Sequence, residues 1–350
     1  MGAGLIGTSL GLAFAQKSHR VSFEDSNQEN LRVAKDLIGG AELAPDIPFD
    51  LLVIATPSEV VFSTLVEKFS SSPSSMFIDI SGLKSELIRE VESFPDLAKR
   101  FCGTHPMAGR EISGPTAARA DLFEGASWII TPTSVTEPEI LKAVSGLLVD
   151  LGTTTKVVDA PTHDRAIAAV SHIPQLLSSL LARTLLDKES GDLELAGQGL
   201  RDLTRLADGN AELWSQLFVR NSENVKSELA QIQRLIDLFL GWLEVKDSAE
   251  IKRFLEEGKT GKSRIPGKHG GKSREYSYLP IVIEDKPGQL ASIFDECKKV
   301  HVNIEDLFIE HSPGQQTGLI TLALSHDDAS ILRTHLANQN WRVHAIRAQR

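Results

Sequence analysis

The first seven residues carry the feature that most limits how this chain can fold. Gly2, Gly4 and Gly7 have the spacing G-x-G-x-x-G, which makes a tight turn between a buried strand and a helix that holds a dinucleotide pyrophosphate. The helix is predicted directly behind the glycines, but no strand stands in front of them. Losing a central strand would exceed a whole stability margin of roughly 5–15 kcal/mol. We therefore expect a truncated or misassigned start, for example through a GTG codon, with Met1 where a Val or Ile normally ends the strand.

An acidic residue supports a dinucleotide site. Asp25 ends the stretch VSFED, 18 residues after Gly7, where a carboxylate binds the adenine ribose hydroxyls. A solvated carboxylate at a strand end is the alternative interpretation of Asp25. Ser26 follows it and no arginine is adjacent to neutralise a 2′-phosphate, so NAD is favoured over NADP. The predicted cofactor residues are Gly2, Gly4, Leu5, Ile6, Gly7, Asp25, Thr56 and Pro57.

The pattern of apolar residues divides the chain into four parts. Apolar strands alternate with amphipathic helices over 1–158, which predicts an α/β Rossmann-type, mostly parallel sheet without its first strand. Residues 159–256 have a helical period throughout, and 257–276 is a flexible basic linker rich in Gly, Lys and Arg. Residues 277–350 predict a βαββαβ unit, a small α+β sheet with two helices. The strands expected in the first part are 21–25, 50–57, 76–82, 100–106, 127–132 and 155–160.

Charge and cysteine content exclude several classes of partner. The net charge of −10 and the pI near 5.5 argue against binding to nucleic acid or to an anionic membrane. Cys102 and Cys297 are too few for a disulfide framework and lack metal-ligand spacing, so no metal site is predicted. Without a secretory signal or an apolar run of membrane-spanning length, the expected compartment is the cytoplasm.

A candidate base lies where a ligand is expected. In an open parallel sheet the ligand site lies outside the carboxyl ends of the strands, and His105 in GTHPMAGRE is at such an end. A dehydrogenase needs a base of near-neutral pKa to take a hydroxyl proton as hydride leaves, and imidazole suits this task. A structural loop histidine is the alternative. In the helical part, His172 and the arginines Arg201 and Arg205 indicate a clamp for an anionic substrate, because guanidinium binds carboxylate in a fork.

Five segments together carry a family resemblance: GAGLIGTSLG, DISGLKSE, GTHPMAGREISGP, AVSHIPQ and GLRDLTRLADGNAELW. In this order they resemble the prephenate and arogenate dehydrogenases of tyrosine biosynthesis, over nearly the whole chain. The resemblance implies oxidative decarboxylation of prephenate or arogenate, with NAD or NADP accepting the hydride. It also implies a homodimer formed largely through the helical domain. The tail, with IEDKPGQLASI, resembles an ACT domain, a regulatory module that some family members carry.

The resemblance also implies roles for single residues. His105 matches the histidine that bonds the substrate's ring hydroxyl and acts as the base, and Arg205 matches the arginine that pairs with a substrate carboxylate. Family members often place a serine at the position of Gly82, so the hydroxyl contact that Ser81 would make from one residue earlier departs from the pattern. The implied substrate-binding residues are Arg205, His172, Glu111, Ser81, Asp202 and Trp214.

The ACT-like tail implies an effector site. Its first strand and first helix are joined by DKPG, in which Pro presets φ and Gly lets the chain turn closely. In ACT domains this loop binds an amino acid, so tyrosine, the end product, is the implied feedback effector. An appendage that only supports dimerisation or folding is the alternative. The effector residues would be Asp285, Pro287, Gly288, Gln289 and Leu290.

Other interpretations remain open from the sequence. Prephenate and arogenate differ by a keto against an amino group, and no residue distinguishes them. A β-hydroxyacid dehydrogenase would share the fold and cofactor but leaves HPMAGRE unexplained. An amino-acid-sensing protein with a degenerate nucleotide fold agrees with Gly82, but His105, His172 and Arg205 together argue against it.

Overall fold

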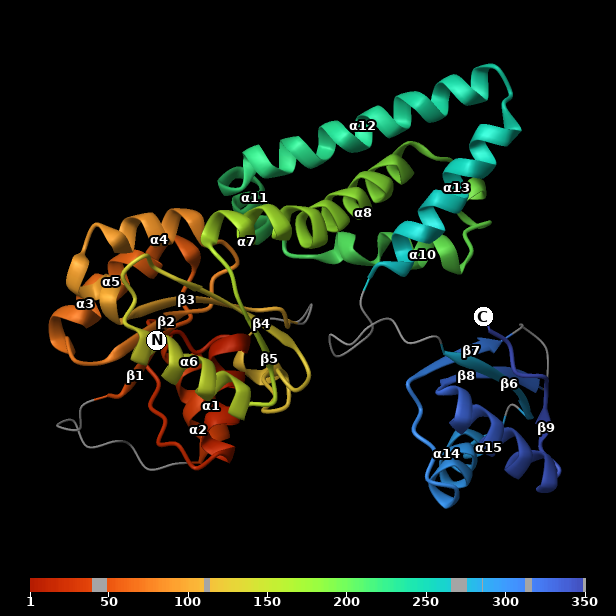
Figure 1. The fold of residues 1–350 in the computed structure, drawn as a ribbon, viewed down its shortest axis with the longest axis horizontal. Helices are drawn as coiled ribbons and strands as arrows, with labels where there is room; N and C mark the ends of the chain where they lie inside the picture. The colour runs from red at the N-terminus through yellow and green to blue at the C-terminus, as the bar shows by residue number, and fades with distance from the viewer. Residues whose placement is uncertain (40–48, 110–113, 266–275, 285, 312–316, 349–350) are drawn as a thin grey trace. The chain divides into compact units, whose positions relative to one another are not determined.

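The computed structural model describes residues 1–39, 49–109, 114–265, 276–284, 286–311 and 317–348 (Figure 1). They divide into two compact units, Met1–Glu256 and Glu257–Arg350. The first unit contains a sheet with helices on its faces and then a purely helical part (Figure 1). The second contains a smaller sheet and two helices.

The first unit is built on a five-stranded sheet with the order β1-β2-β3-β4-β5. The first three strands run parallel, β4 runs antiparallel to β3, and β5 runs parallel to β4. The expected α/β class with a mostly parallel sheet is therefore confirmed. The strands are β1 (Leu51–Ile54), β2 (Met76–Asp79), β3 (Phe101–Pro106), β4 (Ser127–Pro132) and β5 (Thr154–Val157).

Neighbouring residues of the strands point to opposite faces, and helices cover both. Phe77 belongs to the apolar cluster on one face and Ile78 to the cluster on the other. Helices α1 and α6 pack on the face of Ile78 and of buried Trp128, whereas α3, α4 and α5 pack on the face of Phe77. The helices are α1 (Leu5–Gln16), α2 (Gln28–Ile38), α3 (Val61–Ser71), α4 (Ser85–Glu92), α5 (Pro95–Arg100) and α6 (Pro138–Asp150), with short 3-10 turns at Ser58–Val60 and Pro115–Ala117.

The strand predicted at 21–25 is wrong, because the structure forms no strand there. Among the described residues, 21–24 make a single backbone hydrogen bond, from the Gly2 N–H to the Glu24 carbonyl at 2.8 Å. A strand needs a hydrogen-bonded partner along its length. The apolar pattern of VSFED is that of a strand, but the chain offers it no neighbour beyond this one contact.

The second part of the first unit is helical, as predicted. The helix that follows the sheet begins at the Asp159 cap, passes through a π-helical turn at Ala168–His172, and continues as α8. Pro174 has no N–H to donate to the preceding turn, which explains the change of hydrogen-bond pattern here. The helices are α7 (Ala160–Ile167), α8 (Ile173–Thr184), α9 (Ser190–Leu193), α10 (Gln198–Thr204), α11 (Ala211–Arg220), α12 (Ser222–Glu244) and α13 (Ser248–Ser263), with 3-10 turns at Leu185–Asp187 and Arg205–Asp208.

The predicted flexible linker is corrected at its beginning. Helix α13 continues through Ser263, so the first seven residues of 257–276 are helical. Phe254 on α13 packs against the rings of Phe239 and Trp242 on α12, which anchors the helix. Residues 266–275 of the predicted linker lie outside the described part of the chain.

The second unit has the βαββαβ order expected from the sequence. Its four strands form an antiparallel sheet in the order β7-β8-β6-β9. Strand β9 is short, because Pro280 lies on the edge of β6 that faces it and has no N–H to donate. The elements are β6 (Ser277–Glu284), α14 (Gln289–Lys299), β7 (Asp306–His311), β8 (Thr317–Leu324), α15 (His326–Asn338) and β9 (Arg342–Val343).

Candidate active site

The glycine loop at the start of α1 is tightly packed on one side and open on the other. Gly2 has a φ of +88°, and a Cβ there would lie 2.3 Å from the Ala55 carbonyl oxygen. A Cβ on Gly7 would lie 2.1 Å from the Gly2 carbonyl oxygen. At Gly4, in contrast, a Cβ would meet no atom within 4 Å. The outer glycines therefore allow the chain to pack on itself, and the middle one leaves an open face at the helix N-terminus.

Two further predicted cofactor residues, Asp25 and Thr56, lie around this loop. Asp25 accepts hydrogen bonds from the Ala3 N–H at 2.6 Å and the Asn27 N–H at 2.7 Å, so its carboxylate is held at the glycines. Thr56 follows β1, and its backbone N lies 3.0 Å from a Cβ built on Gly2. The Thr56 hydroxyl is buried without a hydrogen-bond partner among the described residues. An unpartnered buried hydroxyl beside the loop is a donor available to a ligand.

The structure gives His105 a partner that the sequence did not reveal, His163, which is itself bonded to Asp164. His105 lies in β3, and its Nδ1 is 2.9 Å from Nε2 of His163 on α7. His163 Nδ1 is in turn 2.7 Å from Oδ1 of Asp164. The carboxylate of Asp164 also accepts the backbone N–H groups of Lys84 and Ser85, at 2.9 and 2.8 Å. These contacts hold a hydrogen-bonded series of three side chains, His105–His163–Asp164, at the end of β3. This series is called the His105 chain below.

The hydrogen-bond chemistry of the three groups assigns the proton positions. An ionised Asp164 only accepts, so His163 Nδ1 carries the hydrogen. When His163 carries its hydrogen on Nδ1 alone, its Nε2 accepts and His105 Nδ1 donates to it. His105 Nε2 is consequently the unprotonated nitrogen. A Cβ built on Gly82 would lie 3.9 Å from this Nε2 and 3.5 Å from the Leu217 Cδ2, so Gly82 leaves the nitrogen without a neighbouring side chain from position 82 itself.

Burial keeps this chain of groups in the required charge states. Burial, with Lys84 and His163 nearby, lowers the pKa of His105 well below its usual 6.5, so His105 is neutral at neutral pH. Burial alone would raise the pKa of Asp164, but hydrogen bonds from His163, Ser85 and Lys84 outweigh it and the net pKa is lowered. A neutral imidazole next to an anchored carboxylate is suited to accept one proton.

A buried ion pair underlies the site. Lys84 and Asp79 have fully buried side chains, and the Lys84 ammonium contacts the Asp79 carboxylate. Burial lowers the pKa of Lys84, and Asp79 opposes this shift. The Ser81 hydroxyl donates to Asp79 and accepts from Lys84 Nζ at 3.0 Å. The Ser81 hydroxyl is therefore engaged with the ion pair, and its predicted contact with substrate stays a prediction.

The helical part adds an aromatic wall. The buried imidazole of His172 meets the rings of Trp214 and Phe218 on α11 edge-on, at centroid distances of 5.9 and 6.0 Å. The Asn221 amide lies 3.2 Å from His172 Nδ1 and donates to the Asp164 carbonyl at 2.9 Å. The structure therefore connects His172 and Trp214 to the His105 chain through Asn221.

The remaining predicted residues are not brought into this network by the described contacts. Arg205 and Asp202 are exposed on the segment of α10 and the turn that follows it, and Asp202 accepts from Gln198 at 2.7 Å. Glu111 and Asp285 lie outside the described residues. In the second unit, Gly288 has a φ of +90° and precedes α14, which begins at Gln289. The turn expected at Pro287 and Gly288 is thus present, and the effector role of Pro287, Gly288, Gln289 and Leu290 stays a prediction.

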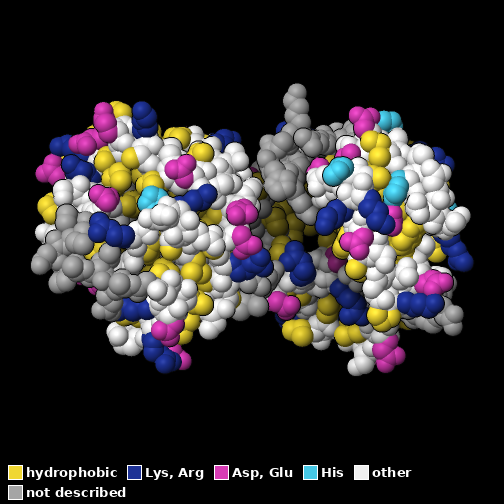
Figure 2. Space-filling model, turned by 90° about the horizontal axis from the view of Figure 1, so that it is seen from below, with side chains coloured by type: hydrophobic (Ala, Val, Ile, Leu, Met, Phe, Trp, Pro, Cys, Tyr) yellow, Lys and Arg dark blue, Asp and Glu magenta, His cyan; other side chains and the backbone are white. Residues whose placement is uncertain are grey.

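The signal for His163 and Asp164 was present but weak. Both lie on α7, shortly after the carboxyl end of β5, where residues can reach a ligand site at the sheet edge. Within the described residues, no group of three or more His, Cys, Asp or Glu side chains could hold a metal ion. Nor does any described helix have the length and apolar character needed to cross a membrane. On the face drawn in Figure 2, acidic and basic side chains are interspersed.

Comparisons with known proteins assign both parts of the first unit. Residues 10–157 match the family model "Prephenate dehydrogenase, nucleotide-binding domain", and residues 159–257 match "Prephenate dehydrogenase, dimerization domain". The chain is 28% identical over 352 residues to a probable prephenate dehydrogenase, NovF, of Streptomyces niveus, covering 97% of each chain.

Solved structures agree with this assignment. A prephenate dehydrogenase from A. aeolicus, in complex with hydroxyphenyl propionate and NAD+, is 26% identical with a TM-score of 0.68, over 75% of this chain and 95% of that one. A Synechocystis arogenate dehydrogenase is 25% identical with a TM-score of 0.66, over 75% of this chain and 97% of that one.

Proposed function

This chain belongs to the prephenate dehydrogenase family, and from this premise we propose that it is an oxidoreductase that converts prephenate to 4-hydroxyphenylpyruvate with NAD. The observation that carries the proposal is the chain His105–His163–Asp164, which leaves His105 Nε2 unprotonated at the end of β3. A family fold without a base would fit a sensing protein. The intact base favours an enzyme.

The residues around the glycine loop fit NAD. Gly4 leaves open space at the α1 N-terminus for a pyrophosphate, and the hydroxyl of Thr56 is without a partner among the described residues. Asp25 keeps oxygen lone pairs for a ribose hydroxyl, beside Ser26 rather than a cation. NAD, when bound, accepts the hydride from the substrate. NADP is the less favoured cofactor.

The work of the protein is to hold the substrate and take its proton. As hydride leaves the ring carbon that carries the hydroxyl, His105 Nε2 takes the hydroxyl proton and becomes positively charged. The His105 Nδ1–H still donates to His163, and Asp164 stabilises the new charge through His163. The bond to the ring carboxylate then breaks and CO2 leaves. Its electron pair completes the aromatic ring, and protonated His105 returns its proton to the ring oxygen, which gives the hydroxyl of the product. Aromatisation makes the step effectively irreversible.

The substrate is a dicarboxylate, so it needs a cation in a protein of net charge −10. We assign this role to Arg205, with His172, Trp214, Asp202, Glu111 and Ser81 as further contacts. Leaving a carboxylate unpaired in a dry pocket would cost several kcal/mol. Arg205 is exposed in the single chain, and we propose that a second copy of the chain encloses this end of the site.

Arogenate is the second candidate substrate, favoured by the similarity to the Synechocystis arogenate dehydrogenase. NADH formation with purified chain distinguishes the candidates. We expect turnover with prephenate and NAD, and much weaker turnover with NADP. Turnover with arogenate alone would assign the arogenate dehydrogenase activity, and no turnover with either would support the sensing protein.

For the second unit we propose an ACT-type regulatory domain with tyrosine as its feedback effector. Its βαββαβ sheet and the positive φ of Gly288 before α14 support this. Deleting residues 273–350 should abolish inhibition by tyrosine and keep the activity measured without it, and Gly288→Val should weaken inhibition. Equal inhibition with and without the unit would place tyrosine in the active site as a product analogue.

A cytoplasmic location of this protein stays a prediction.

A further inference from the structure

Asn221, between α11 and α12, contacts two other segments of the helical part. It is 5% exposed, so its side chain is buried. The side-chain amide nitrogen donates to the Asp164 carbonyl on α7 at 2.9 Å and lies 3.2 Å from Nδ1 of His172. The amide oxygen accepts from the Asn224 amide at 2.8 Å. Each hydrogen-bonding atom of the Asn221 side chain therefore has at least one partner.

The Asp164 carbonyl determines which way this amide is turned. A carbonyl oxygen can only accept, so the nitrogen of Asn221, and not its oxygen, faces it. The same nitrogen is the atom that faces His172 Nδ1. An amide nitrogen has two hydrogens to donate and does not accept, so Nδ1 of His172 must be the unprotonated nitrogen. The hydrogen of a neutral His172 is therefore on Nε2.

Burial keeps His172 neutral. The residue is 1% exposed, and burial lowers its pKa below the usual 6.5, although Asp164 opposes the shift. Within the described part of the chain, His172 Nε2 has no hydrogen-bond partner. A buried N–H without a partner is available to a ligand. His172 therefore offers one hydrogen, and no lone pair, to a group that lies beside Nε2.

The two imidazoles of the site thus have opposite hydrogen-bonding roles. His105 Nε2 is an acceptor, whereas His172 Nε2 is a donor. They lie close enough for the charge of His172 to affect the pKa of His105. The acceptor suits a ring hydroxyl from which a proton is taken. The donor suits an oxygen atom with a free lone pair.

We propose that Asn221 is a positioning residue that fixes the hydrogen of His172 on Nε2, and that this hydrogen selects a keto over an amino side chain in the substrate. The keto oxygen of prephenate can accept the Nε2–H. The ammonium group of arogenate has no lone pair, so it would place its hydrogens against another hydrogen in a buried site. The selection rests on the proposed dehydrogenase function, whereas the position of the hydrogen does not.

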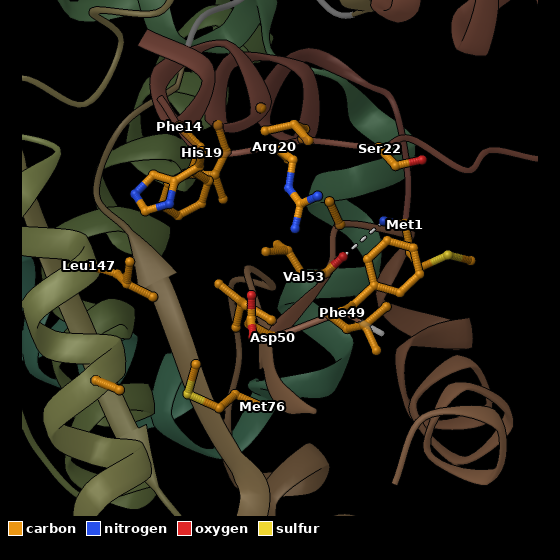
Figure 3. Close-up of a pocket in the computed structure, with 18 of the residues that line it drawn as sticks. Met1, Phe14, His19, Arg20, Ser22, Phe49, Asp50, Val53, Met76 and Leu147 are labelled. Carbon is orange, nitrogen blue, oxygen red and sulfur yellow. Dashed lines mark hydrogen bonds between the residues drawn. The ribbon is translucent and has the colours of Figure 1, made fainter. Parts of the chain in front are cut away.

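His19 is a histidine of this chain without such a partner. Figure 3 shows it beside Phe14 at the cavity next to β1, where the two rings meet edge-on with centroids 5.5 Å apart. His19 is exposed, and its imidazole makes no hydrogen bond to the residues that the structure describes. Its two neutral forms therefore exchange in water, which makes His19 an internal reference for a histidine whose hydrogen is not fixed.

The first test locates the hydrogen of His172 in the full chain without substrate. Long-range proton–nitrogen correlation NMR, on chain with isotope-labelled histidine at a pH above the usual imidazole pKa, separates protonated from unprotonated ring nitrogens. The signal lost in His172→Gln assigns His172. We expect a protonated Nε2 and an unprotonated Nδ1 at His172, and averaged signals at His19. A hydrogen on Nδ1 of His172 in the native chain would overturn the proposal.

The second test compares two variants of the same hydrogen-bond network. Asn221→Leu removes both donated hydrogens, so we expect the hydrogen of His172 to be shared between its two nitrogens. The ratio of kcat/KM for prephenate to kcat/KM for arogenate should then fall at least about tenfold. Asn224→Ala is the matched control, because it removes a hydrogen bond to Asn221 but leaves both of its donors in place. The NMR signals and the ratio of this control should equal the native ones.

An unchanged ratio in Asn221→Leu with a displaced hydrogen would show that His172 does not select the substrate. A native hydrogen position in this variant would show that Asn221 does not control it. If Asn221→Leu cannot be purified, the native chain is titrated with 4-hydroxyphenylpyruvate, a keto acid, and with tyrosine. The keto acid should shift the Nε2 signal of His172 more, and equal shifts would contradict the selection. Absence of turnover with both substrates in the native chain would contradict the proposed function, and the NMR result on the hydrogen would be unaffected.

Discussion

At the scale of single residues, one nitrogen atom governs the proposed chemistry. His105 Nε2 is unprotonated because His105 donates from Nδ1 to His163, and His163 accepts because its other nitrogen donates to Asp164. The three side chains come from β3 and α7. The charge state of His105 is thus controlled by residues that need not contact the substrate.

Replacing His105 with Asn should lower kcat by about 10²–10⁴, the usual loss for a general base, while the affinity for NAD is kept. In the native enzyme the base is active when neutral. Its pKa is lowered well below 6.5 by burial, so kcat should stay flat down to pH 6.5 and fall only at more acidic pH. Steady-state NADH formation against pH measures both effects. Near-native turnover in His105→Asn would remove the histidine from the mechanism.

The lowered pKa of His105 also predicts how the free energy of unfolding depends on pH. The unfolded chain binds a proton at His105 at a higher pH than the folded chain does, so protonation favours unfolding. The contribution of His105 is complete above its unfolded pKa of about 6.5 and declines as pH falls below it. The His105→Asn variant should lose less stability than the native chain over this acid range in urea titrations.

His163 is the positioning residue of the group. His163→Phe keeps the ring but removes the acceptor for His105 Nδ1–H, and we expect kcat to fall roughly tenfold to a hundredfold with KM nearly unchanged. His163→Gln, whose amide oxygen can accept the same hydrogen bond, should recover part of the loss and serves as the control. Equal activity of the two variants would show that the hydrogen bond does not orient the base.

At the scale of elements, different glycines of the loop before α1 serve folding and the proposed binding of NAD. Gly2 and Gly7 pack against backbone atoms, whereas Gly4 faces open space. The loop is therefore rigid on one side and accessible on the other, as a phosphate site requires.

Two alanine variants test this division. Gly4→Ala meets no atom within 4 Å, so its melting temperature should equal the native value, while its Kd for NAD should rise at least about tenfold. Gly2→Ala places a Cβ 2.3 Å from a carbonyl oxygen at a φ of +88°, and should destabilise folding by about 1–3 kcal/mol or more. Calorimetry and NAD titration measure the pair. Unchanged NAD binding in Gly4→Ala would move the pyrophosphate elsewhere.

At the scale of the whole molecule, the helical part exposes more apolar surface than a separate chain normally keeps. On α12 alone, five large apolar side chains are exposed: Leu235, Ile236, Leu238, Leu240 and Leu243. We infer that a second copy covers them, in agreement with the matched dimerization-domain model.

The paired substitution Leu235→Asp and Leu238→Asp should convert a dimer to a monomer in light scattering after gel filtration, because each carboxylate would be desolvated at the interface. Lys226→Ala, on an exposed part of the same helix, should leave the mass unchanged. A dimeric mass in the double variant would exclude this face of α12 from the interface.

The sequence by itself determined the elements whose pattern is local. Alternating and helical periods located the five strands, the helical part and the βαββαβ unit, because burial of one face requires that period wherever the segment packs. The glycine spacing located the tight turn before α1, and the position of His105 at a strand end indicated the base that we propose.

Only the tertiary structure decided the features that depend on distant partners. The apolar segment 21–25 has the pattern of a strand, but whether it becomes one depends on a neighbour supplied from elsewhere. His163 lies 58 residues from His105, and no local pattern marks it as the acceptor that sets the tautomer of the base. The ion pair of Lys84 with Asp79 likewise depends on the burial of both side chains by surrounding elements. Packing in three dimensions determines which elements hydrogen-bond to one another. Periodicity along the sequence indicates which face of an element is buried, but not which distant residue contacts it.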